Sequence, residues 1–260
     1  MKVLYDRIGR DYDATRRADP RIAQRIVSLL SASNGGEYLD LACGTGNYTI
    51  ALRNMGLRIC GVDQSELMIS RAKEKAPDME WHFGDAELLP FPGGSFQGVT
   101  CILAIHHFKN VRNALMEVFR VIDKGRLVIF TAYPEQMKDY WLNEYFPQAM
   151  RRAIRQMLSK RDLFGHLEAV GFQRIVEEDF EVPYDLQDLF LQSGKYKPEI
   201  YLQPEVRAGI STFANLTSKQ EVSEGCRRLE QDIQSGHINQ VIVDYATRSG
   251  DYVFVAAEKE

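Results

Sequence analysis

Three aspartates and two glycines have the residue types and spacing to hold a nucleotide-like ligand. Asp40, Asp63 and Asp85 each end a short apolar run, and Gly44 and Gly46 follow the first of these acids. The carboxylates can neutralise an ammonium group, accept hydrogen bonds from two ribose hydroxyls and accept one from an adenine amino group. Each acid alone would more often be a helix cap or a solvated turn, but the three in register predict one cofactor site.

The two glycines lie where an expected strand turns into a helix that starts at Tyr48. Glycine allows a positive φ and lets a ligand approach without meeting a Cβ, and the helix N-terminus presents free N–H groups. Such a turn opens many nucleotide-binding α/β sheets, although glycines can also serve backbone geometry alone. The turn therefore predicts a ligand site only together with the acids.

Two adjacent histidines, His106 and His107, follow another expected strand and are the candidates for a catalytic base. Imidazole titrates near neutral pH, so it suits an acceptor that must lose a proton. Because neighbours at a strand end point in opposite directions, we expect at least one of the two to pack or cap. The other histidines show no ligand spacing with this pair, and we expect no metal site.

Five strands alternate with helical patterns between residues 19 and 132, which predicts an α/β fold with a doubly wound, mostly parallel sheet. Ligands of such sheets bind outside the carboxyl ends of the strands, which is where the aspartates and the histidines fall. The expected strands end at Asp40 or span 58–62, 80–83, 96–103 and 126–131, and two later strands span 172–180 and 251–257.

The pattern changes after residue 132, where aromatic and methionine side chains recur at helical spacing. Residues 184–236 look mainly helical, with breaks at Pro198, Pro204 and Gly225. We expect the insertions and the N-terminus to form a lid over the carboxyl edge of the sheet that excludes water. We expect one domain over 1–260, with a core of 19–132, 159–182 and 248–260 and lid insertions of 1–18, 133–158 and 184–247.

The bulk composition is that of an ordinary globular protein, with 260 residues, 45% hydrophobic content, 26% charged content and a net charge of -4. Polyanion binders usually carry a basic field, so we expect no nucleic-acid partner. No apolar run approaches the roughly 20 residues that span a bilayer, and the N-terminus lacks the apolar core of a signal peptide. Four cysteines without a C-x-x-C pair fit a reducing compartment. We expect a cytoplasmic protein with no membrane partner.

Five short segments carry a family resemblance: 40–46, 62–65 with Met68, 84–91, 95–96 and 125–129. They resemble the class I S-adenosylmethionine-dependent methyltransferases of the type 11 group, which includes the ubiquinone/menaquinone-biosynthesis enzymes. One departure is Ala42, where the family commonly has its first glycine. The resemblance implies a seven-stranded sheet of order 3-2-1-4-5-7-6 with an antiparallel last strand. It also implies S-adenosylmethionine as the cofactor and S-adenosylhomocysteine as its product.

The resemblance extends to individual site residues. For the acceptor it implies contacts from the N-terminus and from the segment after strand five, although these aromatics can equally form an ordinary helix core. We assign acceptor binding to Tyr5, Tyr12, Tyr133, Tyr140, Trp141 and Tyr145. We assign cofactor binding to Asp40, Ala42, Gly44, Gly46, Asp63, Gln64, Met68, Asp85, Ala86, Leu103 and Arg16.

The predicted activity is in-line methyl transfer to nitrogen or oxygen of a small aromatic or heteroaromatic acceptor, by a monomer or homodimer. Ring and methionine side chains in the insertions favour stacking with such an acceptor. C-methylation of a quinone-like ring, O-methylation of a carrier-bound acyl group and cofactor binding without catalysis stay open as alternatives. A nicotinamide enzyme is disfavoured, because Thr49 takes the third glycine position of its G-x-G-x-x-G fingerprint.

Overall fold

A seven-stranded sheet forms the centre of the protein in a computed structural model that describes residues 12–32, 35–246 and 250–260. The strand order is β3-β2-β1-β4-β5-β7-β6, and β7 runs antiparallel to both of its neighbours while the other pairs are parallel. The predicted α/β fold, strand order and antiparallel last strand are confirmed. The strands are β1 (Glu37–Leu41), β2 (Arg58–Asp63), β3 (Trp81–Phe83), β4 (Phe96–Ile102), β5 (Ile122–Thr131), β6 (Gln173–Phe180) and β7 (Tyr252–Lys259).

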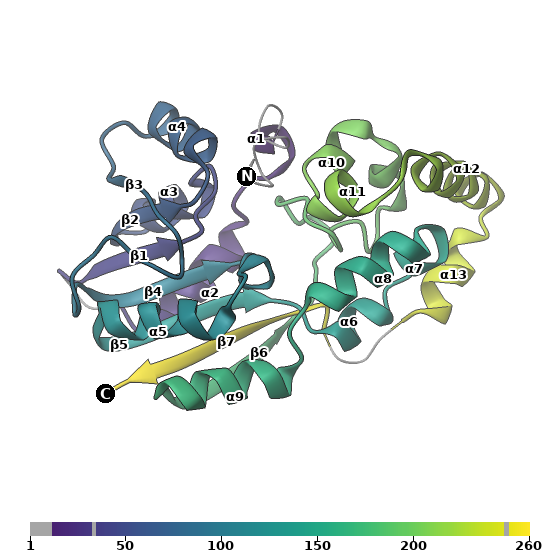
Figure 1. The fold of residues 1–260 in the computed structure, drawn as a ribbon. Coiled ribbons are helices and arrows are strands. Elements are labelled where there is room, and N and C mark those ends of the chain that lie inside the picture. The colour runs from purple at the N-terminus through teal and green to yellow at the C-terminus, as the bar shows by residue number, and fades with distance from the viewer. Residues whose placement is uncertain (1–11, 33–34, 247–249) are drawn as a thin grey trace.

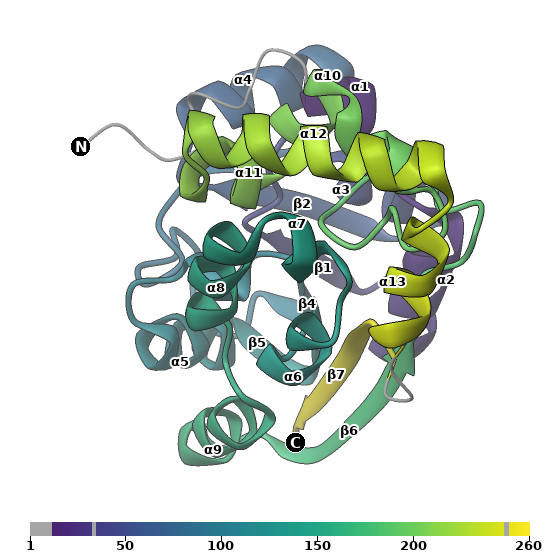
Figure 2. The same ribbon diagram turned by 90° about the vertical axis from the view of Figure 1, so that its right-hand side faces the viewer.

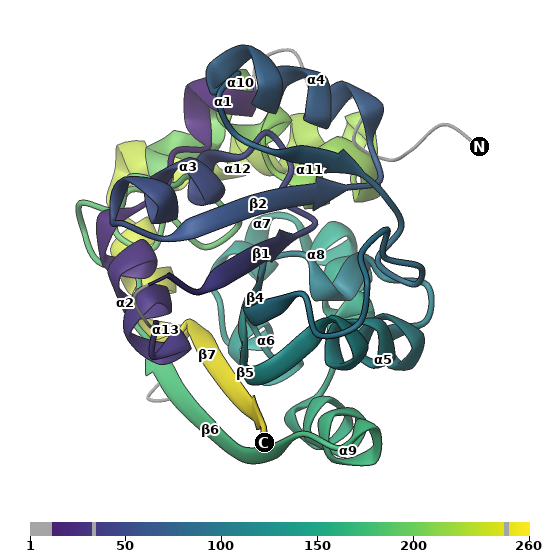
Figure 3. The same ribbon diagram turned by 90° about the vertical axis from the view of Figure 1, so that its left-hand side faces the viewer.

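Helices cover both faces of this sheet, as Figure 3 shows. Successive strand side chains point to opposite faces, so Tyr38 packs into the core on the α2 side, whereas Leu39 and Leu41 pack on the α5 side. Both faces are therefore buried, which is why the strands are apolar without alternation. On one face lie α2 (Pro20–Leu30) and α3 (Asn47–Asn54), on the other α5 (Val111–Val121) and α9 (Lys160–Val170), while α4 (Glu66–Lys75) packs on β2 and β3.

The remaining helices stand together beyond the carboxyl ends of the parallel strands (Figure 1), and Figure 2 views this helical layer from the front. Within the layer α8 packs on α6, α7 and α11, and α12 packs on α7, η3 and α13. None of the described helices is long and apolar enough to cross a membrane. The layer consists of α6 (Pro134–Lys138), α7 (Leu142–Tyr145), α8 (Pro147–Gln156), η3 (Pro198–Leu202), α10 (Pro204–Ala208), α11 (Ser211–Leu216), α12 (Lys219–Ser235) and α13 (Ile238–Asp244).

A short helix from the N-terminal part of the chain, α1 (Tyr12–Thr15), lies between α4 and α10 in Figure 1. It contacts α10 of the helical layer, and Asp13 accepts hydrogen bonds from Thr45 and Asn47 at the turn after β1. The lid role expected for residues 1–18 stays a prediction, and residues 1–11 lie outside the described residues.

Two local predictions were wrong. Residues 181–197 contain no helix, although helix was expected from 184, and this loop is fixed by buried polar contacts instead. Gly225 does not break a helix but lies within α12, where a Cβ would come 2.4 Å from the Phe146 ring. A glycine therefore serves close packing at this position rather than a turn.

Candidate active site

The turn between β1 and α3 has left-handed backbone at three positions: Ala42 (φ +56°), Gly44 (φ +55°) and Gly46 (φ +78°). Different constraints favour glycine at positions 44 and 46. A Cβ at Gly46 would lie 2.3 Å from the Trp81 ring, so that position serves packing. A Cβ at Gly44 would meet no atom within 4 Å, and Gly44 borders the main cavity. The space beside Gly44 is thus the part of the turn that is open to a ligand.

Asp63, the last residue of β2, faces this turn. Its Oδ2 accepts a hydrogen bond from the Gly44 N–H (2.9 Å), and its Oδ1 accepts one from the Ser65 N–H (2.8 Å). Burial raises the pKa of the Asp63 carboxyl above its ordinary value, against the effect of these hydrogen bonds. The carboxylate is therefore held in one orientation at the cavity wall, beside Gln64 and Met68.

Asp40 lies deeper behind the turn and is 2% exposed. Its two oxygens accept hydrogen bonds from the hydroxyls of Thr49 (2.6 Å) and Thr100 (2.9 Å). Burial raises the pKa of this carboxyl to about 6, although the two hydroxyls act in the opposite direction. Asp40 borders a recess that it shares with Arg16 and Gly44.

Asp85 and Ala86 border a second recess, beyond Asp63. The Asp85 carboxylate also accepts a hydrogen bond from the Glu87 N–H (3.0 Å) and so caps its own turn. Ala42 borders both recesses and the main cavity. The three sequence-predicted acids therefore follow one edge of the sheet, with Asp40 at one end and Asp85 at the other.

The main cavity encloses about 1090 Å³, including the part that opens to solvent, and lies between this edge and the helical layer. On the sheet side it is bordered by five further predicted residues: Arg16, Ala42, Gln64, Met68 and Leu103. On the insertion side its wall is mainly apolar and consists of Met137, Ala153, Met157, Phe190, Leu191 and Ile210, with Gln156, Ser211, Thr212 and Tyr252 as polar members.

His106 and His107 both border the cavity, but they do not end a strand. They lie in a 3-10 turn, η2 (Ile105–His107), and their ring centroids are 3.9 Å apart. The expectation that they point in opposite directions is therefore wrong, because the turn brings consecutive side chains to the same side. Burial lowers the pKa of His107 to about 4 and that of His106 well below its ordinary value, with a further contribution from His107. Both rings are neutral at pH 7.

The four described insertion aromatics with an acceptor assignment do not border the cavity. Tyr133, Tyr140, Trp141 and Tyr145 are 2–7% exposed and pack within the cores. Their polar atoms bond to protein groups, for example the Tyr145 hydroxyl to the Asp232 carboxylate (2.8 Å) and the Tyr140 hydroxyl to that of Tyr201 (2.7 Å). Their helical spacing thus reflects core packing, the ordinary interpretation of such a pattern, and not the cavity wall. Tyr5 lies outside the described residues, and of Tyr12 only the backbone, which begins α1, is described.

Sequence reasoning missed Tyr252 and the α11 residues at the cavity. Tyr252 is the first residue of β7, and an antiparallel strand begins at the edge where parallel strands end. From the implied strand order, Tyr252 could therefore have been placed at the ligand-binding edge of the sheet. No comparable signal marked Ile210, Ser211 or Thr212, because their approach depends on the tertiary path of the insertion.

The chain matches the family model described as "Methyltransferase domain" over residues 39–130. It is 36% identical over 145 residues to a demethylmenaquinone methyltransferase of Thermotoga maritima, a match that covers 53% of this chain and 63% of the relative. It is 30% identical to a 2-phytyl-1,4-naphtoquinone methyltransferase of Thermosynechococcus vestitus, covering 67% of this chain and 91% of the relative.

A solved structure, described as a putative methyltransferase from an antibiotic biosynthesis pathway of Anabaena variabilis, is 34% identical to this chain. The match covers 93% of this chain and 98% of that one, with a TM-score of 0.84. The chain thus belongs to the class I S-adenosylmethionine-dependent methyltransferases, in the group defined by this methyltransferase domain. Its cofactor is S-adenosylmethionine.

The residues present fit this cofactor. The open space beside Gly44 admits a ligand next to the backbone, and the oriented Asp63 carboxylate suits ribose hydroxyls. No cluster of histidine, cysteine and acidic side chains suited to a metal ion occurs among the described residues.

Proposed function

We propose that this chain transfers a methyl group from S-adenosylmethionine to nitrogen or oxygen of a small molecule with a flat aromatic or heteroaromatic ring. The observation that carries the proposal is the single cavity that Gly44 and Asp63 share with the apolar wall of the insertions. An acceptor ring against Met157 and Phe190 would lie in the same space as the cofactor edge. Sulfur and ring side chains favour contacts with flat ligands.

The cofactor residues have distinct proposed roles. Asp63 would accept hydrogen bonds from the ribose, and Asp85 would accept one from the adenine amino group. Asp40 would act near the ammonium group, and Gly44 would leave room for the ligand. When bound, the cofactor supplies an activated methyl group on a good leaving group. The chain then has to orient the acceptor and exclude water, which proximity and enclosure achieve.

His106 is the proposed partner of the acceptor. Its Nδ1 is buried and has no hydrogen-bond partner among the described residues. Because the ring is neutral at pH 7 and borders the cavity, its unprotonated nitrogen can accept a hydrogen bond from an acceptor hydroxyl or ring N–H, and can take up the proton that such a group loses. An acceptor without such a proton would use the ring only for orientation.

C-methylation of a quinone-like ring is the second candidate function. It is favoured by the two relatives named above, which are called demethylmenaquinone and naphthoquinone methyltransferases. The apolar wall would suit such a ring as well. The two candidates differ in the atom that receives the methyl group, so the position of the methyl group in the product separates them.

The test is a methyl-transfer assay with radiolabelled S-adenosylmethionine. The panel contains phenols, small heteroaromatics, a reduced naphthoquinone without its ring methyl group, an acyl-carrier thioester, RNA and protein. The proposal predicts label in a phenol or heteroaromatic, and NMR of the product should place the methyl group on oxygen or nitrogen. Label on ring carbon supports the second candidate. Label only in the thioester, RNA or protein contradicts both, and tight S-adenosylhomocysteine binding without any transfer supports a non-catalytic binder.

A further inference from the structure

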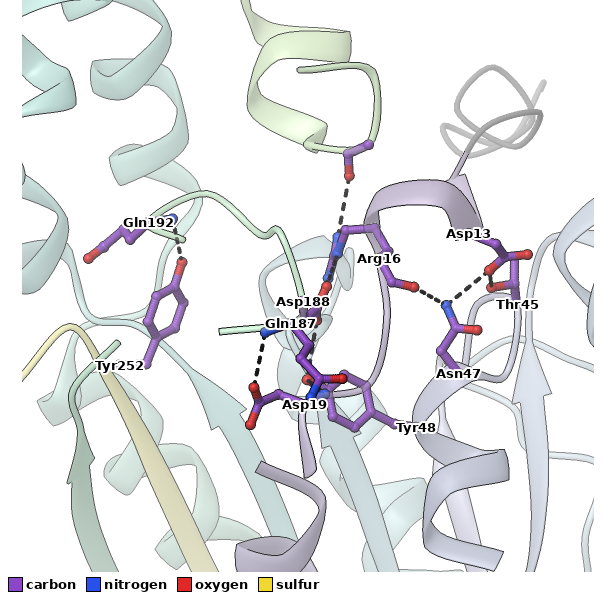
Figure 4. A network of polar contacts seen from close by, with 11 residues as sticks. Asp13, Arg16, Asp19, Thr45, Asn47, Tyr48, Gln187, Asp188, Gln192 and Tyr252 are labelled. Carbon is purple, nitrogen blue, oxygen red and sulfur yellow. Dashed lines mark hydrogen bonds and ion pairs between the residues drawn. The ribbon is translucent and has the colours of Figure 1, made fainter. Parts of the chain in front are cut away.

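A buried ion pair joins the N-terminal segment to the loop of residues 181–197 (Figure 4). Arg16 Nε lies 2.5 Å from Asp188 Oδ1, and Arg16 Nη2 lies 3.3 Å from Asp188 Oδ2. The side chains are 14% and 2% exposed. Such a two-point pair fixes the orientation of a guanidinium as well as its position. Asp188 was not among the residues singled out from the sequence.

The Asp188 carboxylate also contacts the sheet domain. The Tyr48 hydroxyl donates to Asp188 Oδ2 (3.2 Å), and Tyr48 belongs to the first turn of α3, directly after the glycine turn. Burial raises the pKa of the Asp188 carboxyl, while Arg16 and Tyr48 oppose this shift. One carboxylate therefore holds two side chains that flank the recess of Asp40.

The same pair reaches the acceptor side of the cavity. Phe190 and Leu191, two and three residues after Asp188, border the cavity. Arg16 Nη1 donates to the Gly209 carbonyl (3.4 Å), one residue before the cavity residue Ile210. The guanidinium thus contacts two parts of the 184–247 insertion that lie next to cavity residues.

Contacts of Asp13, and not the Arg16–Asp188 ion pair, attach α1 to the glycine turn. Asp13 accepts hydrogen bonds from Thr45 (2.5 Å), Asn47 (2.9 Å) and Lys75 (2.8 Å), and Figure 4 shows the first two beside Arg16. Desolvation acts to raise the pKa of Asp13, but Lys75 and its other partners hold it below its ordinary value. Loss of the Asp188 carboxylate should therefore leave residues 12–16 attached to the sheet domain.

We propose that Asp188 is a positioning residue that couples cofactor binding to the shape of the acceptor cavity, by holding Arg16 between the Gly44 recess and the insertion wall. Arg16 borders both the recess and the cavity. With the carboxylate present, a cofactor that contacts Arg16 also braces residues 188–191 and 209–212. Without it, Arg16 keeps its charge and its long hydrogen bond to the Gly209 carbonyl (3.4 Å) but loses its tie to residues 188–191. An anionic cofactor group would then attract the guanidinium away from the insertion.

The proposal rests on the proposed function only for the identity of the acceptor, so its first test needs no acceptor. Hydrogen exchange is measured in residues 186–192 and 206–216 with and without saturating S-adenosylhomocysteine. In the wild type the ligand should slow exchange in both segments. In Asp188→Asn, which keeps the shape but removes the charge, this slowing should be lost although the ligand still binds.

The matched control is Asp185→Asn, which removes an exposed carboxylate three residues earlier that pairs with Arg21 (2.8 Å). It should respond to the ligand like the wild type. Equal ligand-induced slowing in Asp188→Asn and wild type would overturn the proposal. If Asp188→Asn does not fold, Arg16→Lys keeps the charge without the two-point pair and should show the same loss.

Kinetics on the acceptor found in the methyl-transfer panel give an independent reading. In Asp188→Asn the KM for the acceptor should rise by about fivefold or more, a typical size for coupling between sites. The Kd for S-adenosylhomocysteine should stay unchanged or fall. A general loss of structure would weaken both, so a parallel rise in KM and Kd would contradict a positioning role. Absence of any acceptor in the panel would count against the proposed function, while the exchange result would still decide this proposal.

Discussion

The imidazole rings of His106 and His107 lie against each other, with centroids 3.9 Å apart and planes inclined by 50°. Two protonated rings at this distance would repel each other in a buried environment. Burial, with a further contribution from His107 at His106, lowers the pKa of both rings, so two uncharged imidazoles lie at the wall of the cavity. A neutral ring can accept a proton or a hydrogen bond, whereas an imidazolium can only donate.

The first prediction follows from the neutral imidazole of His106 at the cavity wall. If the acceptor loses a proton, His106→Ala should lower turnover by roughly 10²–10⁴-fold, the usual range for a general base. The Kd for S-adenosylhomocysteine, measured by calorimetry, should be retained. His166→Ala removes a histidine that does not border the cavity and should retain full turnover. Full turnover in His106→Ala would leave the ring with no role in proton removal.

Stability should depend on pH through His107. Its pKa is about 4 in the folded protein and 6.5 in the unfolded chain, so the unfolded chain binds the proton first as the pH falls. Stability is thus fully present above pH 6.5 and is lost as the pH falls toward 4. Denaturant unfolding at pH 7 and pH 5 should show a loss of about 2 kcal/mol from this group, which His107→Gln should remove. An identical pH dependence in His107→Gln would contradict the assignment.

Asp63 should dominate cofactor affinity. Asp63→Ala removes the proposed acceptor of two ribose hydrogen bonds and frees the Gly44 N–H, so binding of S-adenosylhomocysteine should weaken by about tenfold or more. Calorimetry on Asp63→Ala and on Asp78→Ala, an exposed carboxylate that pairs with Arg53, checks this. Unchanged affinity in Asp63→Ala would remove the basis for placing the ribose there.

Ala42 carries backbone strain that a glycine would relieve. An L-residue in the left-handed region costs roughly 1–2 kcal/mol of folding free energy. Glycine avoids this cost but loses more backbone freedom on folding, which destabilises the folded protein by roughly 0.5–1 kcal/mol. Ala42→Gly should therefore be neutral or stabilise the protein by up to about 1.5 kcal/mol in thermal or denaturant unfolding. A clear loss of stability would show that the Ala42 methyl group packs favourably in this turn.

The sheet and its cofactor edge were predictable from sequence because they depend on local signals. These signals each concern a few residues: the apolar runs mark the strands, an acid ends each run, and the glycines after Asp40 allow the turn. Parallel strands then bring those ends to one edge by topology alone. The strand order itself came from the family resemblance. The start of β5 was predicted too late, because residues 122–125 continue the strand through a bulge where a turn was expected.

The acceptor side was predicted poorly because aromatic residue type does not distinguish a cavity wall from a core. The spacing of Trp141 and Tyr145 fits a cavity wall as well as a core. Their burial depends on contacts with α12 and with the loop of residues 181–197. Nothing in the sequence singled out Asp188, because its partner Arg16 is 172 residues away. Such pairs depend on tertiary structure, to which a single sequence gives no access.

Methyl transfer is expected to take place in the cavity between the cofactor edge and the insertions. Gln156 and Arg155 are adjacent, exposed residues of α8, and only Gln156 borders the cavity. Gln156→Trp should narrow the cavity, whereas Arg155→Trp should add a ring outside it. The decisive measurement is transfer of radiolabelled methyl to the small-molecule acceptor by the wild type and both variants. In Gln156→Trp alone, kcat/KM should fall by about tenfold or more, with S-adenosylhomocysteine binding retained. Equal transfer by the two variants, or label confined to RNA, protein or carrier-bound acyl chains, would contradict this expectation.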